Sequence, residues 1–97
     1  MSKTQLHTLA LTKVQSSSQH AHESVKSLSA FMFNSLVLQM ICESEIDDDH
    51  LETLITRIND LCNDTIHFCR WPRYGIGMIR SAKWWSQYLG GGQHDGC

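Results

Sequence analysis

Histidines and acidic residues are the first side chains of this 97-residue chain to consider for metal chemistry. His20 and His22 are two residues apart, so on a helix they point about 200° away from each other, whereas metal ligands on one helix need a spacing of three or four residues. Asp47, Asp48 and Asp49 are consecutive and lack the alternating ligands and central glycine of a calcium-binding loop. We therefore expect no metal and no cofactor.

The sequence gives equally little support for a catalytic nucleophile or for a phosphate-binding loop. His67 and Cys69 are misaligned on a helix for a thiolate–imidazole pair. The chain has no Gly-x-x-x-x-Gly-Lys segment, and the glycines at 90–92 follow a predicted helix, whereas a phosphate-binding loop precedes one. The sequence predicts a protein that is not an enzyme.

The four cysteines favour a reducing compartment. None forms a Cys-x-x-Cys pair, and Cys62 and Cys69 are two helical turns apart, which is too far for a disulfide. We expect reduced thiols, mostly buried in the core, with the terminal Cys97 exposed. The first fourteen residues contain no secretion signal, and no apolar run approaches the ~18 residues of a membrane span. These features predict a cytoplasmic protein.

Aromatic and basic residues gather near the end of the chain. All three tryptophans and both tyrosines lie between Trp71 and Tyr88, interleaved with arginine and lysine. Trp, Tyr and Arg dominate the binding energy of protein interfaces, and the same mixture can stack on bases and neutralise phosphates. A third interpretation places one tryptophan in the core and the others at its rim. We predict a protein-binding surface made of Trp71, Arg73, Tyr74, Arg80, Trp84 and Trp85. Direct nucleic-acid binding is less favoured, because the chain has no basic excess.

The elements that must position these residues are predicted to be helices. Asp47 to Asp49 place negative charge at a helix start, Pro72 ends that helix, and Gly90 ends the next. Residues 6–14 are compatible with a short strand, an extended arm or a weak helix. The prediction is an all-α fold with one domain of residues 1–89, a flexible tail of residues 90–97, and three helices at about 18–43, 48–70 and 76–89.

The first predicted helix carries an apolar surplus. Eight of the eleven side chains from Phe31 to Ile41 are apolar and cover nearly the whole circumference, so that segment must be buried on all sides. A 26-residue helix is ~39 Å long, whereas a chain of this size has a radius of gyration of about 12–13 Å. We expect the helix to overhang and form an intertwined or side-by-side homodimer. The alternative is a kinked helix wrapped by the other two. The predicted self-association residues are Phe31, Phe33, Leu36, Val37 and Leu38.

Charge is unevenly distributed although the net charge is only −2. Eight of the ten acidic residues lie between Glu43 and Asp64, whereas basic residues predominate after Thr65. The two regions can pair within the chain, pair between copies, or face separate partners.

One family resemblance adds to these observations. The Ser-rich segment before the first helix, Phe33-Asn34-Ser35-Leu36-Val37-Leu38, and the run from Arg70-Trp71-Pro72-Arg73-Tyr74 through Gly75-Ile76-Gly77-Met78-Ile79 resemble the small derepression proteins of satellite bacteriophages. The resemblance covers most of the chain. Those proteins are antirepressors that bind the repressor of a resident helper prophage and release its lytic genes. The resemblance implies a DNA-binding protein as partner, a bacterial host cell and no cofactor, and it assigns no site residue.

The sequence therefore predicts a small non-catalytic protein-binding regulator, specifically a phage-encoded antirepressor that prevents a repressor from binding its operator. One alternative is a small nucleic-acid-binding regulator that uses the basic, aromatic segment. Another is an assembly subunit that forms large homo-oligomers. In a variant of the antirepressor hypothesis, Asp47 to Asp49 imitate nucleic acid and block a DNA-binding surface.

Overall fold

Four α-helices and one short 3₁₀ helix make up the described part of the chain. The computed structural model describes residues 1–68 and 72–90, with the side chains of 72–74 excepted. The helices are α1 (Lys3–Ser18), α2 (Val25–Glu43), η1 (Asp48–His50), α3 (Leu51–Phe68) and α4 (Pro72–Gly90). The predicted all-α class is confirmed, and the predicted number of three helices is wrong.

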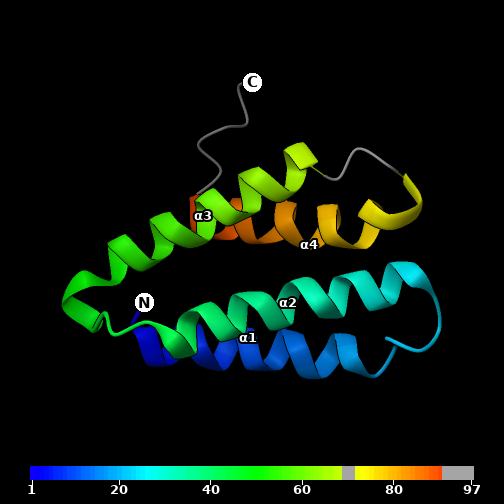
Figure 1. Ribbon diagram of the computed structural model, residues 1–97. Helices are drawn as coiled ribbons and strands as arrows, with labels where there is room; N and C mark the ends of the chain where they lie inside the picture. The colour runs from blue at the N-terminus through cyan, green and yellow to red at the C-terminus, as the bar shows by residue number, and fades with distance from the viewer. Residues whose placement is uncertain (69–71, 91–97) are drawn as a thin grey trace.

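The helices form two antiparallel hairpins (Figure 1). One pairs α1 with α2 and the other pairs α3 with α4. The hairpins are joined chiefly by the packing of α2 against α4, so that α2 has neighbours on two sides. The assembly measures 39 × 32 × 18 Å along its principal axes, a thin slab in which each helix keeps part of its surface at solvent.

Residues 6–14, for which the sequence left a strand, an extended arm or a weak helix open, lie within helix α1. Ser2 caps it through a capping box, in which the Gln5 backbone N–H donates to Ser2 Oγ at 3.1 Å and the Ser2 N–H donates to Gln5 Oε1 at 2.7 Å. Leu6 and Ala10, one turn apart, are completely buried. The capped start and the buried face together stabilise a helix whose threonines favour other conformations.

The predicted helix at 18–43 is interrupted by a turn at residues 19–24. The chain ends α1 at Ser18 and restarts α2 under a new cap, where the Ser27 N–H donates to Ser24 Oγ at 3.1 Å. The α2 helix has 19 residues and is therefore ~28 Å long. The prediction that a 39 Å helix would overhang the fold is wrong, because the ~28 Å length of α2 fits within the 39 Å long axis of the molecule.

The boundaries of the later helices also differ from the predicted ones. The second predicted helix, expected at about 48–70, consists of η1 followed by α3, which ends at Phe68. Asp47 caps η1, accepting from the Asp49 N–H at 3.1 Å and contacting the His50 imidazole at 2.9 Å. The hydrogen bond to His50 lowers the pKa of the Asp47 carboxyl. The last helix begins at Pro72, four residues before its predicted start, since proline suits a first helical turn.

The core lies along the contacts of α2 with α1 and α4 and of α3 with α4. Its members are fully buried: Leu6, Ala10, Phe33, Val37, Ile41, Leu54, Ile58, Cys62, Ala82 and Trp85. The α2 and α4 backbones approach so closely at Gly77 that a Cβ there would lie 1.9 Å from the Lys26 carbonyl oxygen. Glycine is required at this crossing, because any side chain would push the two helices apart.

Among the described helices, α2 is the one long and apolar enough to cross a membrane, judged by length and composition. A core helix of a soluble protein passes the same test. However, only 28% of its most apolar 18-residue stretch is buried inside the fold. The apolar surplus predicted for this region is therefore only partly covered by the chain itself.

Candidate functional site

Trp85 is a core residue that is hydrogen-bonded to its neighbours on other helices. It is fully buried, and its indole Nε1 donates to Asn34 Oδ1 at 3.0 Å. Asn34 Nδ2 donates in turn to Ser17 Oγ at 3.3 Å, and Ser17 Oγ donates to the Lys13 carbonyl oxygen at 2.7 Å. This hydrogen-bonded chain links α4, α2 and α1. Trp85 was predicted to bind a partner, but its complete burial leaves no surface with which to do so.

Trp84, its neighbour, lies at the surface with three close contacts. The Lys13 ammonium is 3.6 Å from the ring centroid, a cation–π contact between α1 and α4. The Tyr88 ring stacks on Trp84 at 5.1 Å with an interplanar angle of 9°. Trp85 meets it edge to face at 5.0 Å. Trp84 is thus held in one orientation by two aromatic rings and one cation.

Two adjoining cavities open beside Trp84 and share Lys13 and Asn34 as lining residues. Their volumes are about 200 and 350 Å³. Their lining residues come from α1, the turn at residues 19–24, α2 and α4. We refer to both cavities together as the Trp84 groove, which is lined by Lys13, Ser16, Ser17, His20, Glu23, Ser27, Ala30, Asn34, Arg80, Ser81 and Trp84.

The Trp84 groove contains two cations without acidic partners. In the described part of the chain, no carboxylate lies within 4.0 Å of the Lys13 ammonium or the Arg80 guanidinium. Glu23, the acidic lining residue, contacts His20 at 2.9 Å instead. Unpaired cations next to hydroxyl and amide groups favour an anionic group as ligand, because charge-assisted hydrogen bonds are the strongest polar contacts available.

A nucleobase is a poor fit for the same groove. Base stacking needs an open aromatic face, and Trp84 is already engaged by Lys13 and by the Tyr88 ring. A base would have to displace one of these contacts.

The structure describes only some of the remaining predicted site residues. Trp71 lies outside the described residues, as do the side chains of Arg73 and Tyr74. Arg80 and Trp84 come together in the Trp84 groove. Among the predicted self-association residues, Phe33 and Val37 are fully buried in the core, Phe31 and Leu38 are half-buried, and Leu36 is 41% exposed. The burial of Phe33 and Val37 removes them from any dimer interface of the folded chain.

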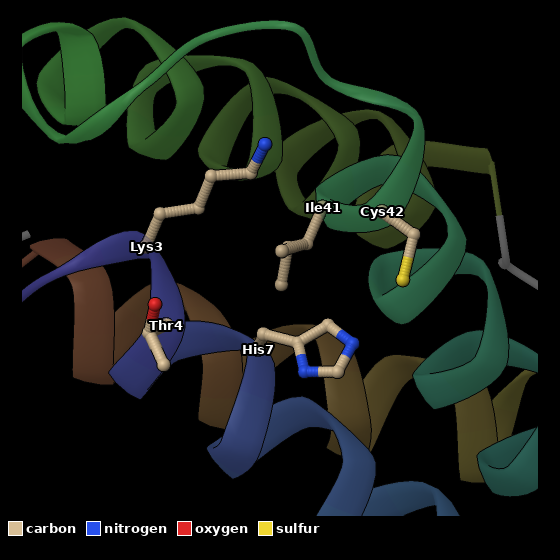
Figure 2. A pocket seen from close by; sticks show the side chains of 5 residues that line it. All are labelled: Lys3, Thr4, His7, Ile41 and Cys42. Atoms are coloured by element: carbon tan, nitrogen blue, oxygen red, sulfur yellow. The ribbon is translucent and has the colours of Figure 1, made fainter.

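A third cavity of about 350 Å³ lies at the other end of the α1–α2 hairpin (Figure 2). It is lined by Lys3, Thr4, His7, Ile41 and Cys42. The Lys3 ammonium donates to the Ser44 carbonyl oxygen, and its backbone N–H donates to Asp48 Oδ1 at 2.8 Å. These bonds fasten the start of α1 to the segment that follows α2.

His7 and Cys42 line that cavity together, a pairing of imidazole and thiol that their separation in sequence does not reveal. No hydrogen bond joins the two side chains. A cysteine nucleophile needs an adjacent base within hydrogen-bonding reach to form its thiolate. In this structure the imidazole and the thiol therefore share a cavity without a direct hydrogen bond.

The thiols differ in accessibility. Cys62 is fully buried in the core, and burial raises the pKa of its thiol to about 11. Cys42 is exposed, contrary to the expected burial, and both are free thiols. Cys69 and Cys97 lie outside the described residues. Within the described part of the chain, no three His, Cys, Asp or Glu side chains gather where they could hold a metal ion.

Comparisons with protein-family models, with curated proteins and with solved structures found no match to this chain.

Lys13 and Asn34, which line both cavities, are among the groove residues that the sequence interpretation missed. Lys13 follows Leu6 and Ala10 on one helical face, at spacings of four and three residues. This repeat is the signal that could have placed Lys13 beside the core. No pattern in the sequence identifies Asn34 as the partner of Trp85.

Proposed function

We propose that this protein is a small non-catalytic regulator that binds another protein through the Trp84 groove. The observation that carries the proposal is the pair of cations, Lys13 and Arg80, which have no carboxylate within 4.0 Å among the described residues and lie beside the ordered ring of Trp84. The expected partner feature is an acidic segment, whose carboxylates the two cations hold while Trp84 and Tyr88 provide apolar contact. Tyr88 is 47% exposed and so has surface available for that contact.

The particular regulator we propose is a phage antirepressor that acts in the cytoplasm of a bacterial host cell. Support for this step comes from the resemblance of the chain to the satellite-phage derepression proteins. In this proposal the partner is a DNA-binding repressor of a helper prophage, which is held in a form that cannot engage its operator. A homodimer, expected from the apolar surplus of residues 31–41, is part of the proposal.

The energy that such a mechanism needs is modest. Shifting a repressor from 99% to 1% binding-competent takes a differential affinity of about 10⁴, or roughly 5.5 kcal/mol. An interface of standard size with a few aromatic and charged anchors supplies that much. No bond has to be made or broken, so binding energy alone suffices.

The decisive experiment is affinity purification of the tagged protein from nuclease-treated host cells, followed by mass spectrometry. We expect a stoichiometric repressor, whose operator complex then dissociates in a gel-shift assay when this protein is added. Recovery of the protein alone, with nucleic acid retained only when nuclease is omitted, would favour the nucleic-acid-binding alternative. Large homo-oligomers without a partner would favour an assembly subunit.

Charge reversal in the groove tests the site within the same assay. We expect Lys13→Glu and Arg80→Glu each to weaken partner binding by about 10- to 100-fold, because each leaves a partner carboxylate facing a like charge. Arg57→Glu is the matched control, since Arg57 is an exposed cation on α3 outside the groove. Equal losses for all three variants would mean that net charge and not the groove governs binding.

A further inference from the structure

The Trp84 groove carries charges of both signs, which line different parts of it. The cavity of about 200 Å³ is lined by Arg80 and Trp84, and we call it the cationic pocket. The cavity of about 350 Å³ is lined by His20 and Glu23, and we call it the Glu23 pocket. Lys13 lines both cavities, and Glu23 alone among the described lining residues is acidic.

The order of the charges along the groove follows from the packing of the helices. Helices α1 and α2 run antiparallel, whereas α4 runs parallel to α2, since Gly77 lies against the start of α2 and Trp85 bonds to its middle (Figure 1). On the α1 side the groove therefore extends from Lys13, beside Trp84, to His20, beside Glu23. Seven residues at 1.5 Å each make this distance about 10 Å.

Glu23 is able to bind a cation from a ligand. Its carboxylate accepts from His20 Nδ1 at 2.9 Å and has no other polar partner in the described part of the chain. A carboxylate has about four lone-pair sites, so this one contact leaves most of its acceptor capacity unused. The side chain of Glu23 is also 54% exposed, which leaves it accessible from solvent.

Hydroxyl groups without partners line both pockets. Ser16 lines the Glu23 pocket and Ser81 lines the cationic pocket. Neither hydroxyl forms a hydrogen bond with any described residue, in contrast to Ser17, which donates to the Lys13 carbonyl oxygen. Such donors favour an extended polypeptide segment as ligand, because its backbone carbonyls are not paired within the segment and can accept from them.

We propose that the Trp84 groove binds an extended segment of its partner and recognises two opposite charges in it. An acidic side chain of the segment occupies the cationic pocket, and a basic side chain lies against Glu23. The inference rests on the proposed function, since it specifies the acidic segment that the groove binds. In the polyproline II conformation, side chains three positions apart point the same way and lie about 9 Å from each other. This spacing matches the groove, so the segment has an acidic and a basic residue three positions apart.

A uniformly acidic segment or a nucleic-acid backbone fits the groove less well. Negative charges recur along both, so one of them would meet Glu23 while another meets Lys13 and Arg80. Like charges that face each other across an interface cost binding energy, and such repulsion is a common means of rejecting wrong partners. Lys13 and Arg80 thus supply the attraction, whereas Glu23 determines specificity.

Four synthetic peptides test this charge pattern against the 97-residue chain. They share one proline-containing frame and differ at two positions, three apart, which carry Glu and Lys, Lys and Glu, Glu and Glu, or Lys and Lys. Binding is measured by NMR titration of the isotope-labelled chain at low salt, because salt screens exposed charges. We expect one of the mixed peptides to bind roughly 3- to 10-fold more tightly than the Glu–Glu peptide and to shift the indole signal of Trp84.

Reversing the charge of Glu23 should reverse this preference. The Glu23→Lys variant should bind the Glu–Glu peptide roughly 3- to 10-fold more tightly than the mixed peptide. Asp60→Lys is the matched control, because Asp60 is an exposed acid on α3 that lines neither pocket, and this variant should keep the native preference. Circular dichroism should show the same helix content for both variants.

Three results would overturn the inference. The first is equal binding of the mixed and Glu–Glu peptides by the native chain, and the second is an unchanged preference in Glu23→Lys. Either result would leave an acidic partner of the groove standing. The third is binding of none of the peptides at millimolar concentration, in which case the affinity purification still decides the proposed function. Failure of the groove itself is recognised differently, since Lys13→Glu and Arg80→Glu would then bind every peptide as the native chain does.

Discussion

Replacing Asn34 by leucine should destabilise the protein although the two side chains are close in size. The substitution removes the acceptor of the Trp85 indole N–H, a 3.0 Å hydrogen bond inside the core. It also deprives Ser17 Oγ of a 3.3 Å contact. Because a buried donor left without a partner keeps its full desolvation cost, we expect a loss of about 1–3 kcal/mol in the free energy of unfolding.

That loss is easily measured in a domain of this size. A change of 1 kcal/mol shifts the Tm of a 60–100-residue domain by roughly 4–8 °C, so Asn34→Leu should melt at least about 4 °C below the native chain. Chemical denaturation followed by far-UV circular dichroism reports the unfolding of all four helices together. The protein concentration must be the same for every variant, since a dimer would make stability concentration-dependent.

A double-mutant cycle identifies the hydrogen bond as the cause. Trp85→Phe removes the donor together with part of the ring, so Asn34→Leu should cost about 1–2 kcal/mol less in that background than in the native one. Asn63→Leu, an exposed position on α3, is the control and should change stability by less than about 0.5 kcal/mol. Additive costs in the cycle would refute the reasoning, and so would an Asn34→Leu variant as stable as the control.

Three further changes test the helix contacts. Gly77→Ala should lower the Tm, although alanine stabilises most helices by up to ~1 kcal/mol relative to glycine, because its Cβ would lie 1.9 Å from the Lys26 carbonyl oxygen. The second change replaces Cys69 and Cys97 by serine and exposes the chain to iodoacetamide at about pH 8. The reagent should modify the exposed Cys42 and leave Cys62 intact until the chain unfolds. Burial raises the pKa of the Cys62 thiol to about 11, so little of it is present as the reactive thiolate. Modification of both thiols in the native chain would contradict the buried position. Ser2→Ala should cost about 1 kcal/mol by removing the cap of α1, and an unchanged Tm would mean that the capping box is not formed in solution.

Helix α3 shows where sequence patterns are sufficient. Leu54, Ile58, Cys62 and Thr65 recur at spacings of three and four residues, and all four are buried. An amphipathic repeat of this kind has only one face that can pack, so the pattern predicts both the helix and its orientation.

Residues 3–43 show where the patterns fall short. The break between α1 and α2 contains neither proline nor glycine, and the chain reverses there with a serine cap as its only local signal. The α1 helix has threonines and alternating leucines, which leave its conformation undecided locally. It is stabilised by the burial of Leu6 and Ala10 against other helices, and such contacts are not encoded in a short window of sequence.

The candidate site depends even more on the tertiary structure. The cluster of tryptophans and basic residues near the end of the chain was visible in the sequence, and two of its members, Trp84 and Arg80, line one cavity in the structure. The sequence did not show that adjacent tryptophans divide between surface and core, with Trp85 bonded to Asn34. Nor did it show that Lys13, 71 residues before Trp84, supplies a cation to the same groove.

The sequence by itself determined the helical class, the apolar surplus of residues 31–41 and the concentration of aromatic and basic side chains near the end of the chain. These properties follow from residue type and periodicity, which act over one or two helical turns. The tertiary structure alone decided which faces are covered: the crossing of α2 and α4 at Gly77 buries Phe33 and Val37 and leaves Met32 and Leu36 at solvent. An all-round apolar helix has no preferred side of its own, so only its packing partners can select the face that remains open.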